Sequence, residues 1–114
     1  MVIVDDHDSF RATARQVLSG EGFDVVGEAV DASSAVETVS RLRPDVLLLD
    51  VMLPGPDGFA VVDILAAVGC LPQTVLISSR QASTFRQRLA TTRARGFISK
   101  ADLTGPALEA LLMP

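Results

Sequence analysis

Short runs of apolar residues recur along the chain and alternate with longer segments that have helical spacing. Each run is rich in β-branched or leucine side chains and ends at a polar residue, which is typical of strands in a buried sheet. The predicted strands are residues 2–4, 23–30, 46–49, 74–77 and 96–99. The run Val46–Leu49 is apolar throughout and lies between two aspartates, which favours a central strand covered on both faces.

The segments between these runs carry apolar residues three and four positions apart, as amphipathic helices do. The second helix ends before Pro44, and the third spans residues 59–68. The expected start signals are Ser9 or Asp8, a capping box of Ser34 with Glu37, Asp57, and Pro106 for a last helix to Met113. The expected buried faces are Phe10, Ala14, Val17 and Leu18 in the first helix, Ala35, Val36, Val39 and Leu42 in the second, and Phe85 and Leu89 in the fourth.

Five strands that alternate with five helices over short connections predict an open, doubly wound parallel sheet with helices on both faces. In such sheets, ligands bind at the carboxyl ends of the strands, where the strand order reverses. The candidate functional residues are therefore the polar residues that follow the strands. They are Asp5, Asp6, Asp50, Ser78 and Lys100.

The composition fits a single globular domain over residues 1–114, because 48% of the residues are hydrophobic and 21% are charged. A formal net charge of −4 gives no bulk attraction to nucleic acid or to an anionic membrane. The longest apolar stretches, such as Ile64–Val68, are far shorter than the roughly 18 residues of a membrane span. No signal peptide is expected, and the lone Cys70 excludes an intrachain disulfide, so we expect a cytoplasmic protein.

Basic residues gather in the second half of the chain. Residues 1–63 hold twelve acidic and four basic residues, whereas residues 64–114 hold two acidic and six basic residues. The arginines between Arg80 and Arg95 form either a solvated helix or a surface for an acidic or phosphate-bearing partner. Lys100 is the only lysine, which indicates a position that needs a compact ammonium group.

Three carboxylates in one crevice repel one another unless a cation lies among them, and oxygen ligands with room for water favour Mg²⁺. The expected ligands are one carboxylate of the Asp5 and Asp6 pair, Asp50, and a backbone carbonyl just beyond Asp50. An aspartate beside Mg²⁺ and Lys100 is suited to attack phosphorus and form an aspartyl phosphate. The residues alone equally allow a set of helix caps and turn aspartates.

Two further residues have weaker indications. His7 follows the acidic pair, and its place after the strand end favours the start of a loop over a metal ligand. Cys70 is expected to be a small apolar filler near a loop.

Four parts of the chain are also recognisable together. They are residues 2–7 (VIVDDH) with Phe10 and Arg11, residues 43–58 (RPDVLLLDVMLPGPDG), Ser78, and residues 96–100 (GFISK). This combination spans almost the whole chain and resembles the receiver domain of bacterial two-component response regulators, most of all the NarL/LuxR type. The resemblance implies a flavodoxin-like (CheY-like) fold with strand order 2-1-3-4-5.

The resemblance also implies the role of each site residue. Asp50 is the phosphoacceptor, and Lys100 pairs with its carboxylate or phosphoryl group. Mg²⁺ is bound directly by Asp6, through water by Asp5, and by Asp50 and the backbone carbonyl of Met52. Ser78 and Phe97 match the family's switch positions: phosphorylation draws Ser78 toward Asp50 and lets Phe97 turn inward.

The partners implied are a sensor histidine kinase, an output domain or protein at the surface of the fourth helix, fifth strand and fifth helix, and a phosphorylation-dependent second copy. The controlled process is transcription, with no direct contact between this chain and nucleic acid. Ala101 follows Lys100 where many family members have proline. The strand at Met1 and the short last helix suggest a trimmed or naturally reduced chain and weaken the case for dimerisation through the fifth helix.

Two other functions share parts of this pattern. A pseudo-receiver keeps the fold and works as a phosphorylation-independent interaction module, but it would lack an acid, the hydroxyl or the lysine. A phosphohydrolase of the haloacid dehalogenase type needs an aspartate two residues after the nucleophile, where this chain has Met52. We therefore expect no enzyme activity beyond the chain's own phosphoryl transfer and autodephosphorylation.

Overall fold

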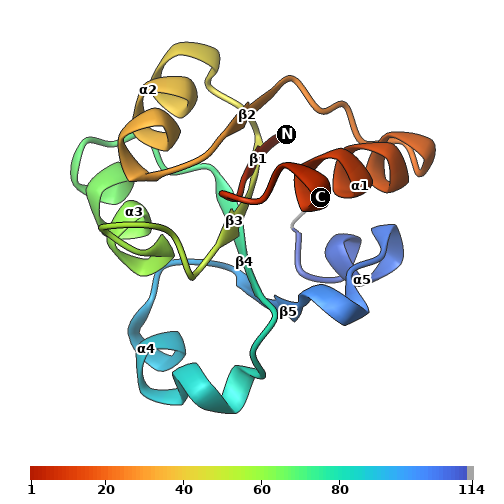
Figure 1. The fold of residues 1–114 in the computed structure, drawn as a ribbon. Coiled ribbons are helices and arrows are strands. Elements are labelled where there is room, and N and C mark those ends of the chain that lie inside the picture. The colour runs from red at the N-terminus through yellow and green to blue at the C-terminus, as the bar shows by residue number, and fades with distance from the viewer. Residues whose placement is uncertain (113–114) are drawn as a thin grey trace.

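Five parallel strands form one sheet in the order β2-β1-β3-β4-β5 in the computed structural model, which describes residues 1–112 (Figure 1). The strands are β1 (Val2–Val4), β2 (Gly27–Ala29), β3 (Val46–Asp50), β4 (Gln73–Ser78) and β5 (Gly96–Ser99). The predicted fold class and strand order are therefore confirmed. In register, Val4 pairs with Leu49, and Asp50 pairs with Ile77, so the ends of these strands lie at one edge.

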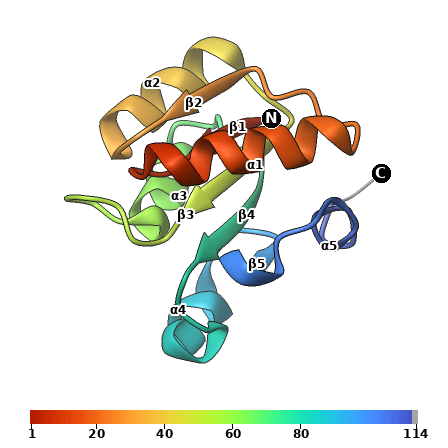
Figure 2. The same ribbon diagram turned by 45° about the vertical axis from the view of Figure 1, so that its right-hand side comes forward.

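Helices cover both faces of the sheet (Figures 1 and 2). The α-helices are α1 (Asp8–Gly20), α2 (Ala32–Leu42), α3 (Gly58–Ala67), α4 (Arg86–Thr91) and α5 (Gly105–Glu109), and the 3-10 turns are η1 (Ala82–Phe85) and η2 (Lys100–Asp102). One core cluster joins α1 and α5 to the sheet, and the other joins α2, α3 and η1 to the opposite face. No helix within residues 1–112 is both long enough and apolar enough to cross a lipid bilayer.

Alternate residues of the central strands supply the two cores, as the pleat of a strand requires. Leu47 and Leu49 of β3 pack toward α2 and α3, whereas Leu48 packs toward α1 and α5. All three leucines are fully buried, and this explains why the run contains no polar position before Asp50. The central strand thus leads from the buried interior to Asp50 at the edge of the sheet.

The edge strand β2 is shorter than predicted. Only Gly27–Ala29 pairs with β1, rather than residues 23–30, and Val26 and Val30 are exposed. A Cβ atom on Gly27 would lie 2.8 Å from Cδ1 of Leu42, so α2 packs directly against the backbone of this strand. The apolar composition overestimates the length of β2, because not all valines of this segment face a core.

Three predicted helix starts are wrong. The first helix begins at Asp8, with His7 at the cap position and no capping bond from either Asp8 or Ser9. The capping box of α2 pairs Asp31 with Ser34, while the side chain of Glu37 pairs with that of Arg41. The last helix starts at Gly105, where Thr104 is the cap.

Other details differ from the predicted amphipathic pattern. The last helix ends at Glu109, and the predicted end at Met113 lies outside the described residues. Val17 is 40% exposed, although it was expected on the buried face of α1. The predicted fourth helix is divided, so Phe85 belongs to η1 and Leu89 to α4. The cap at Asp57 is confirmed, since its side chain accepts the N–H of Ala60.

Gly58 begins α3 directly against the end of β3, where a Cβ atom would lie 2.5 Å from the backbone oxygen of Asp50. We expect Gly58→Ala to lower the free energy of unfolding by about 1–3 kcal/mol, as overpacking does. Gly20→Ala is the matched control, because nothing lies within 4 Å of its added Cβ. Urea titration should show a loss for the first variant and no loss for the second; equal effects would contradict the close packing at Gly58.

Candidate functional site

The carboxyl ends of four strands bring the predicted polar residues to one edge of the sheet. Asp5 and Asp6 follow β1, Asp50 ends β3, Ser78 ends β4, and Lys100 follows β5 directly. Asp5, Asp50 and Ser78 are buried, whereas Asp6 is open to solvent. Within this cluster, Asp6 is therefore the acid that solvent reaches most easily.

The Lys100 ammonium group lies between two buried carboxylates. Its Nζ atom is 2.5 Å from Oδ2 of Asp5 and 3.3 Å from Oδ2 of Asp50. The ring of Phe10, on α1, lies below the same atom with its centroid 4.4 Å away. Cation–π attraction therefore adds to the two ion pairs in holding the ammonium group at this place.

The two buried carboxyl groups have opposite pKa shifts. Burial raises the pKa of Asp50 to about 6, with a further increase from the negative charge of Asp5, against the lowering effects of the Met52 N–H and Lys100. Burial also acts to raise the pKa of Asp5, but hydrogen bonds from Lys100 and the His7 backbone outweigh it and place that pKa below its ordinary value. Asp5 thus ionises more readily than Asp50. The ionised form of Asp50 is the one that an additional positive charge would stabilise most.

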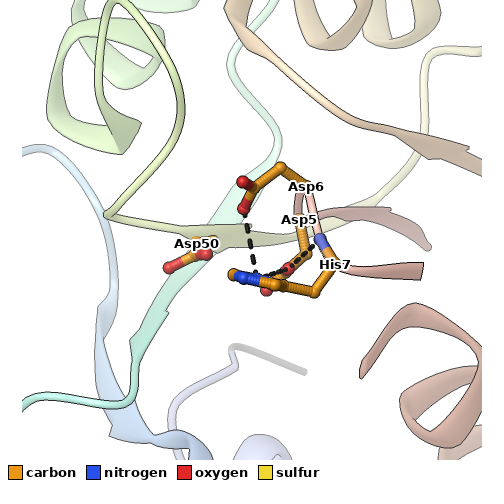
Figure 3. Close-up of side chains that lie close together, drawn as sticks. All are labelled: Asp5, Asp6, His7 and Asp50. Atoms are coloured by element: carbon orange, nitrogen blue, oxygen red, sulfur yellow. Dashed lines mark hydrogen bonds and ion pairs between the residues drawn. The ribbon is translucent and has the colours of Figure 1, made fainter. Parts of the chain in front are cut away.

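Asp5, Asp6, His7 and Asp50 form a group that could hold a metal ion (Figure 3). One ligand atom from each residue lies within 4.8 Å of the others. Three of the four donors are carboxylate oxygens, the ligands that Mg²⁺ and Ca²⁺ prefer. The residues present therefore fit a hard divalent cation.

Backbone N–H groups of the loop after β3 fix the position of Asp50. The N–H of Met52 donates to Oδ1 of Asp50 over 3.1 Å, and the N–H of Val51 donates to the carbonyl of Ile77 over 2.9 Å. The side chain of Met52 is exposed, so it lies at the rim of the site. Asp50 consequently presents one oxygen to this loop and the other to Lys100.

Ser78 and Phe97 lie on the β4 and β5 side of the site. The buried hydroxyl of Ser78 accepts the N–H of Arg80 over 3.1 Å. Phe97 is half-buried and its ring centroid is 5.9 Å from that of Phe85, which in turn is 5.9 Å from that of Phe59. Phe97 therefore belongs to a row of three aromatic rings and not to the acidic cluster itself.

An ion pair that the sequence did not predict connects α4 to the start of α3. Arg88 reaches Oδ2 of Asp57 over 2.7 Å and Oδ1 over 3.0 Å, and its guanidinium carbon lies 4.2 Å above the ring of Phe59. Asp57 thus caps α3 and binds α4 at once. No sequence spacing indicates this contact, because the two residues are 31 positions apart. The contacts of Phe10 with Lys100 and of Gly58 with Asp50 were likewise missed.

Residues 1–108 match the family described as response regulator receiver domain. Protein-glutamate methylesterase/protein-glutamine glutaminase 5 of Myxococcus xanthus is 46% identical over 80 residues, which cover 69% of this chain and 23% of that protein. The DNA-binding transcriptional activator EvgA of Escherichia coli is 29% identical over 101 residues, which cover 89% of this chain and 50% of that protein. The chain thus spans half or less of the length of these curated relatives.

A solved structure supports the same assignment. The signal receiver domain of NarL from Mycobacterium tuberculosis superposes with a TM-score of 0.82 at 33% identity, over 96% of this chain and 93% of that one. The chain therefore belongs to the response regulator receiver domain family, and its relatives place it with the NarL/LuxR type.

Proposed function

We propose that Asp50 accepts a phosphoryl group from the phosphohistidine of a sensor histidine kinase, and that this modification switches the domain. A carboxylate oxygen of Asp50 attacks phosphorus, so an O–P bond forms while the P–N bond breaks and its electron pair stays on the histidine nitrogen. The observation that carries the proposal is the position of Asp50, buried at a strand end with Lys100 3.3 Å away.

The acidic site fits Mg²⁺, with Asp6, Asp50 and the Met52 carbonyl as direct ligands and Asp5 acting through water. When bound, Mg²⁺ would neutralise the charge on the phosphoryl oxygens. Lys100 contributes a second positive charge, which favours the ionised and nucleophilic form of Asp50. Its contact with Asp5 keeps the ammonium group in place while Asp50 changes its charge.

The switch would start at Ser78. Its hydroxyl now accepts the N–H of Arg80, and turning toward a phosphoryl oxygen exchanges that bond for a stronger, charge-assisted one. Movement of Ser78 draws the β4–η1 loop toward Asp50 and opens space for Phe97 beside Phe85. The surface of α4, β5 and α5 then differs between the two states.

Receiver domains are in general not enzymes with a separate substrate. We propose that this one catalyses only its own phosphoryl transfer and autodephosphorylation, in the cytoplasm, as a single domain over residues 1–114. The pseudo-receiver function is disfavoured because the acids, hydroxyl and lysine lie together. A haloacid-dehalogenase-type hydrolase is disfavoured by Met52.

The output partner would bind at the α4, β5 and α5 surface. LuxR-type relatives support an output that controls transcription, with DNA contacted by a part other than these residues. Phosphorylation-dependent pairing of two copies would use the same surface. Arg88 is engaged by Asp57, so Arg86 is the arginine of α4 that we expect to meet an acidic partner.

Incubation with acetyl phosphate tests the phosphoacceptor. We expect intact-mass spectrometry to show one added phosphoryl group that requires Mg²⁺ and is absent from Asp50→Asn. Asp57→Asn is the matched control, because Asp57 faces Arg88 and should leave phosphorylation intact. Addition to Asp50→Asn, or no addition to the unaltered domain, would refute the proposal.

Replacement of Lys100 tests its role in the transfer. Lys100→Ala removes the ammonium group next to Asp50 and should slow phosphorylation about 100-fold, as loss of one charge-stabilising donor does. Lys100→Arg should restore little, since a planar guanidinium does not fit a position shaped for a compact ammonium group. The rate of mass change measures both, and a normal rate in Lys100→Ala would exclude the assigned role.

The raised pKa of Asp50 makes stability depend on pH. Without divalent ions, a carboxyl group whose pKa rises to about 6 on folding stabilises the fold when protonated, and this contribution is lost as the pH rises through 6. Asp50→Asn cannot ionise, so its advantage in the free energy of unfolding should grow from pH 4 to pH 8 by on the order of 2 kcal/mol. Urea titrations across this range check it; an advantage independent of pH would contradict the shift.

A further inference from the structure

His7 lies on the opposite side of Asp5 from Lys100. Asp5 directs Oδ2 to the ammonium group, while its Oδ1 accepts the backbone N–H of His7 over 2.8 Å and lies 3.1 Å from Nδ1 of the imidazole. The same Nδ1 atom lies 3.3 Å from Oδ1 of Asp6. Figure 3 shows the imidazole edge turned toward both carboxylates. His7, which the sequence predicts at the start of a loop, thus places a ring nitrogen beside both acids of the site.

These separations are those of neighbouring ligands on one ion. With metal–ligand distances of about 2.0–2.2 Å, adjacent donors in an octahedral or tetrahedral shell lie roughly 2.8–3.6 Å apart. The Nδ1 atom lies 3.1 Å from Oδ1 of Asp5 and 3.3 Å from Oδ1 of Asp6, as in hydrogen bonds from a protonated Nδ1. Zn²⁺ would replace this proton between the same atoms, and Asp5 would then be a direct ligand instead of one that acts through water. The backbone bond to Asp5 fixes the residue, and a side chain that is 66% exposed leaves the nitrogen within reach of an ion from solvent.

We propose that His7 is a nitrogen ligand of this site when the ion is Zn²⁺, and that it increases the preference of the site for Zn²⁺ over Mg²⁺. The inference rests on the acidic metal site of the proposed function. Imidazole nitrogen is a good donor to Zn²⁺, whereas Mg²⁺ binds oxygen and keeps its water. Of the four side chains in the group, only His7 offers a nitrogen donor, which favours Zn²⁺ over Mg²⁺.

Metal titration of the domain without a polyhistidine tag tests the proposal. Both proteins carry Cys70→Ser, so that the single thiol cannot bind Zn²⁺, and one also carries His7→Phe, which keeps a ring and removes its nitrogens. Calorimetry should show Zn²⁺ affinity lowered at least about tenfold by His7→Phe, with Mg²⁺ affinity changed less than about threefold. Asp6→Asn should weaken both ions, which ties the Zn²⁺ measured to this site.

Nuclear magnetic resonance provides a second test that needs no variant. His7 is the only histidine in the chain, so the imidazole signals belong to it alone. Zn²⁺ should shift the Nδ1 resonance at one equivalent, and Mg²⁺ should leave it nearly unchanged. Zn²⁺ binding without this shift, equal Zn²⁺ affinity in His7→Phe, or no Zn²⁺ binding would overturn the role of His7. Failure of Mg²⁺ alone to bind would instead refute the magnesium site of the proposed function.

Discussion

One ammonium group between two buried carboxylates is the constraint on which the rest of the molecule depends. Removing a carboxylate from water costs several kcal/mol, and two of them side by side add mutual repulsion. Lys100 offsets both terms, but only if β1 and β3 are adjacent and β5 ends close enough for its side chain to span β4. The strand order, the burial of Asp50 and the charge of the site therefore depend on one another. Because one ammonium group serves two carboxylates, the negative charge of Asp50 is only partly neutralised.

Most of the sheet was predictable, because a parallel strand covered on both faces needs an uninterrupted apolar run such as Val46–Leu49. The edge strand β2 was not, since Val26 and Val30 have the composition of a strand but face solvent beside a three-residue ladder. The predicted helix starts were wrong for a different local reason. Several hydroxyl and carboxyl side chains compete for each cap, and local geometry selects Asp31 over the neighbouring serines at α2.

The candidate site was predictable wherever a residue follows a strand directly, since parallel strands bring their ends to one edge of the sheet. Contacts that depend on how a helix is rotated against its neighbours were not. The ring of Phe10 was expected only as apolar filling, yet it also supports the ammonium group of Lys100. Arg88 was counted with an exposed basic surface, whereas its guanidinium is shared with Asp57 and Phe59. The outward-facing charge of α4 is accordingly smaller than the sequence suggests.

The packing of Gly58 against the end of β3 divides the surroundings of Asp50 into a stiff side and a compliant one. On the α3 side, the backbone of Asp50 has no room to move, because Gly58 and Val51 are already in contact. On the β4 side, α4 contains no fully buried residue and is held by the partly buried Leu89, the buried Phe85 of η1 and the ion pair at Asp57. Segments with few buried contacts open at low free energy. We therefore expect a local displacement at Asp50 to be taken up mainly on the side of α4 and β5, because the more compliant of two supports deforms more.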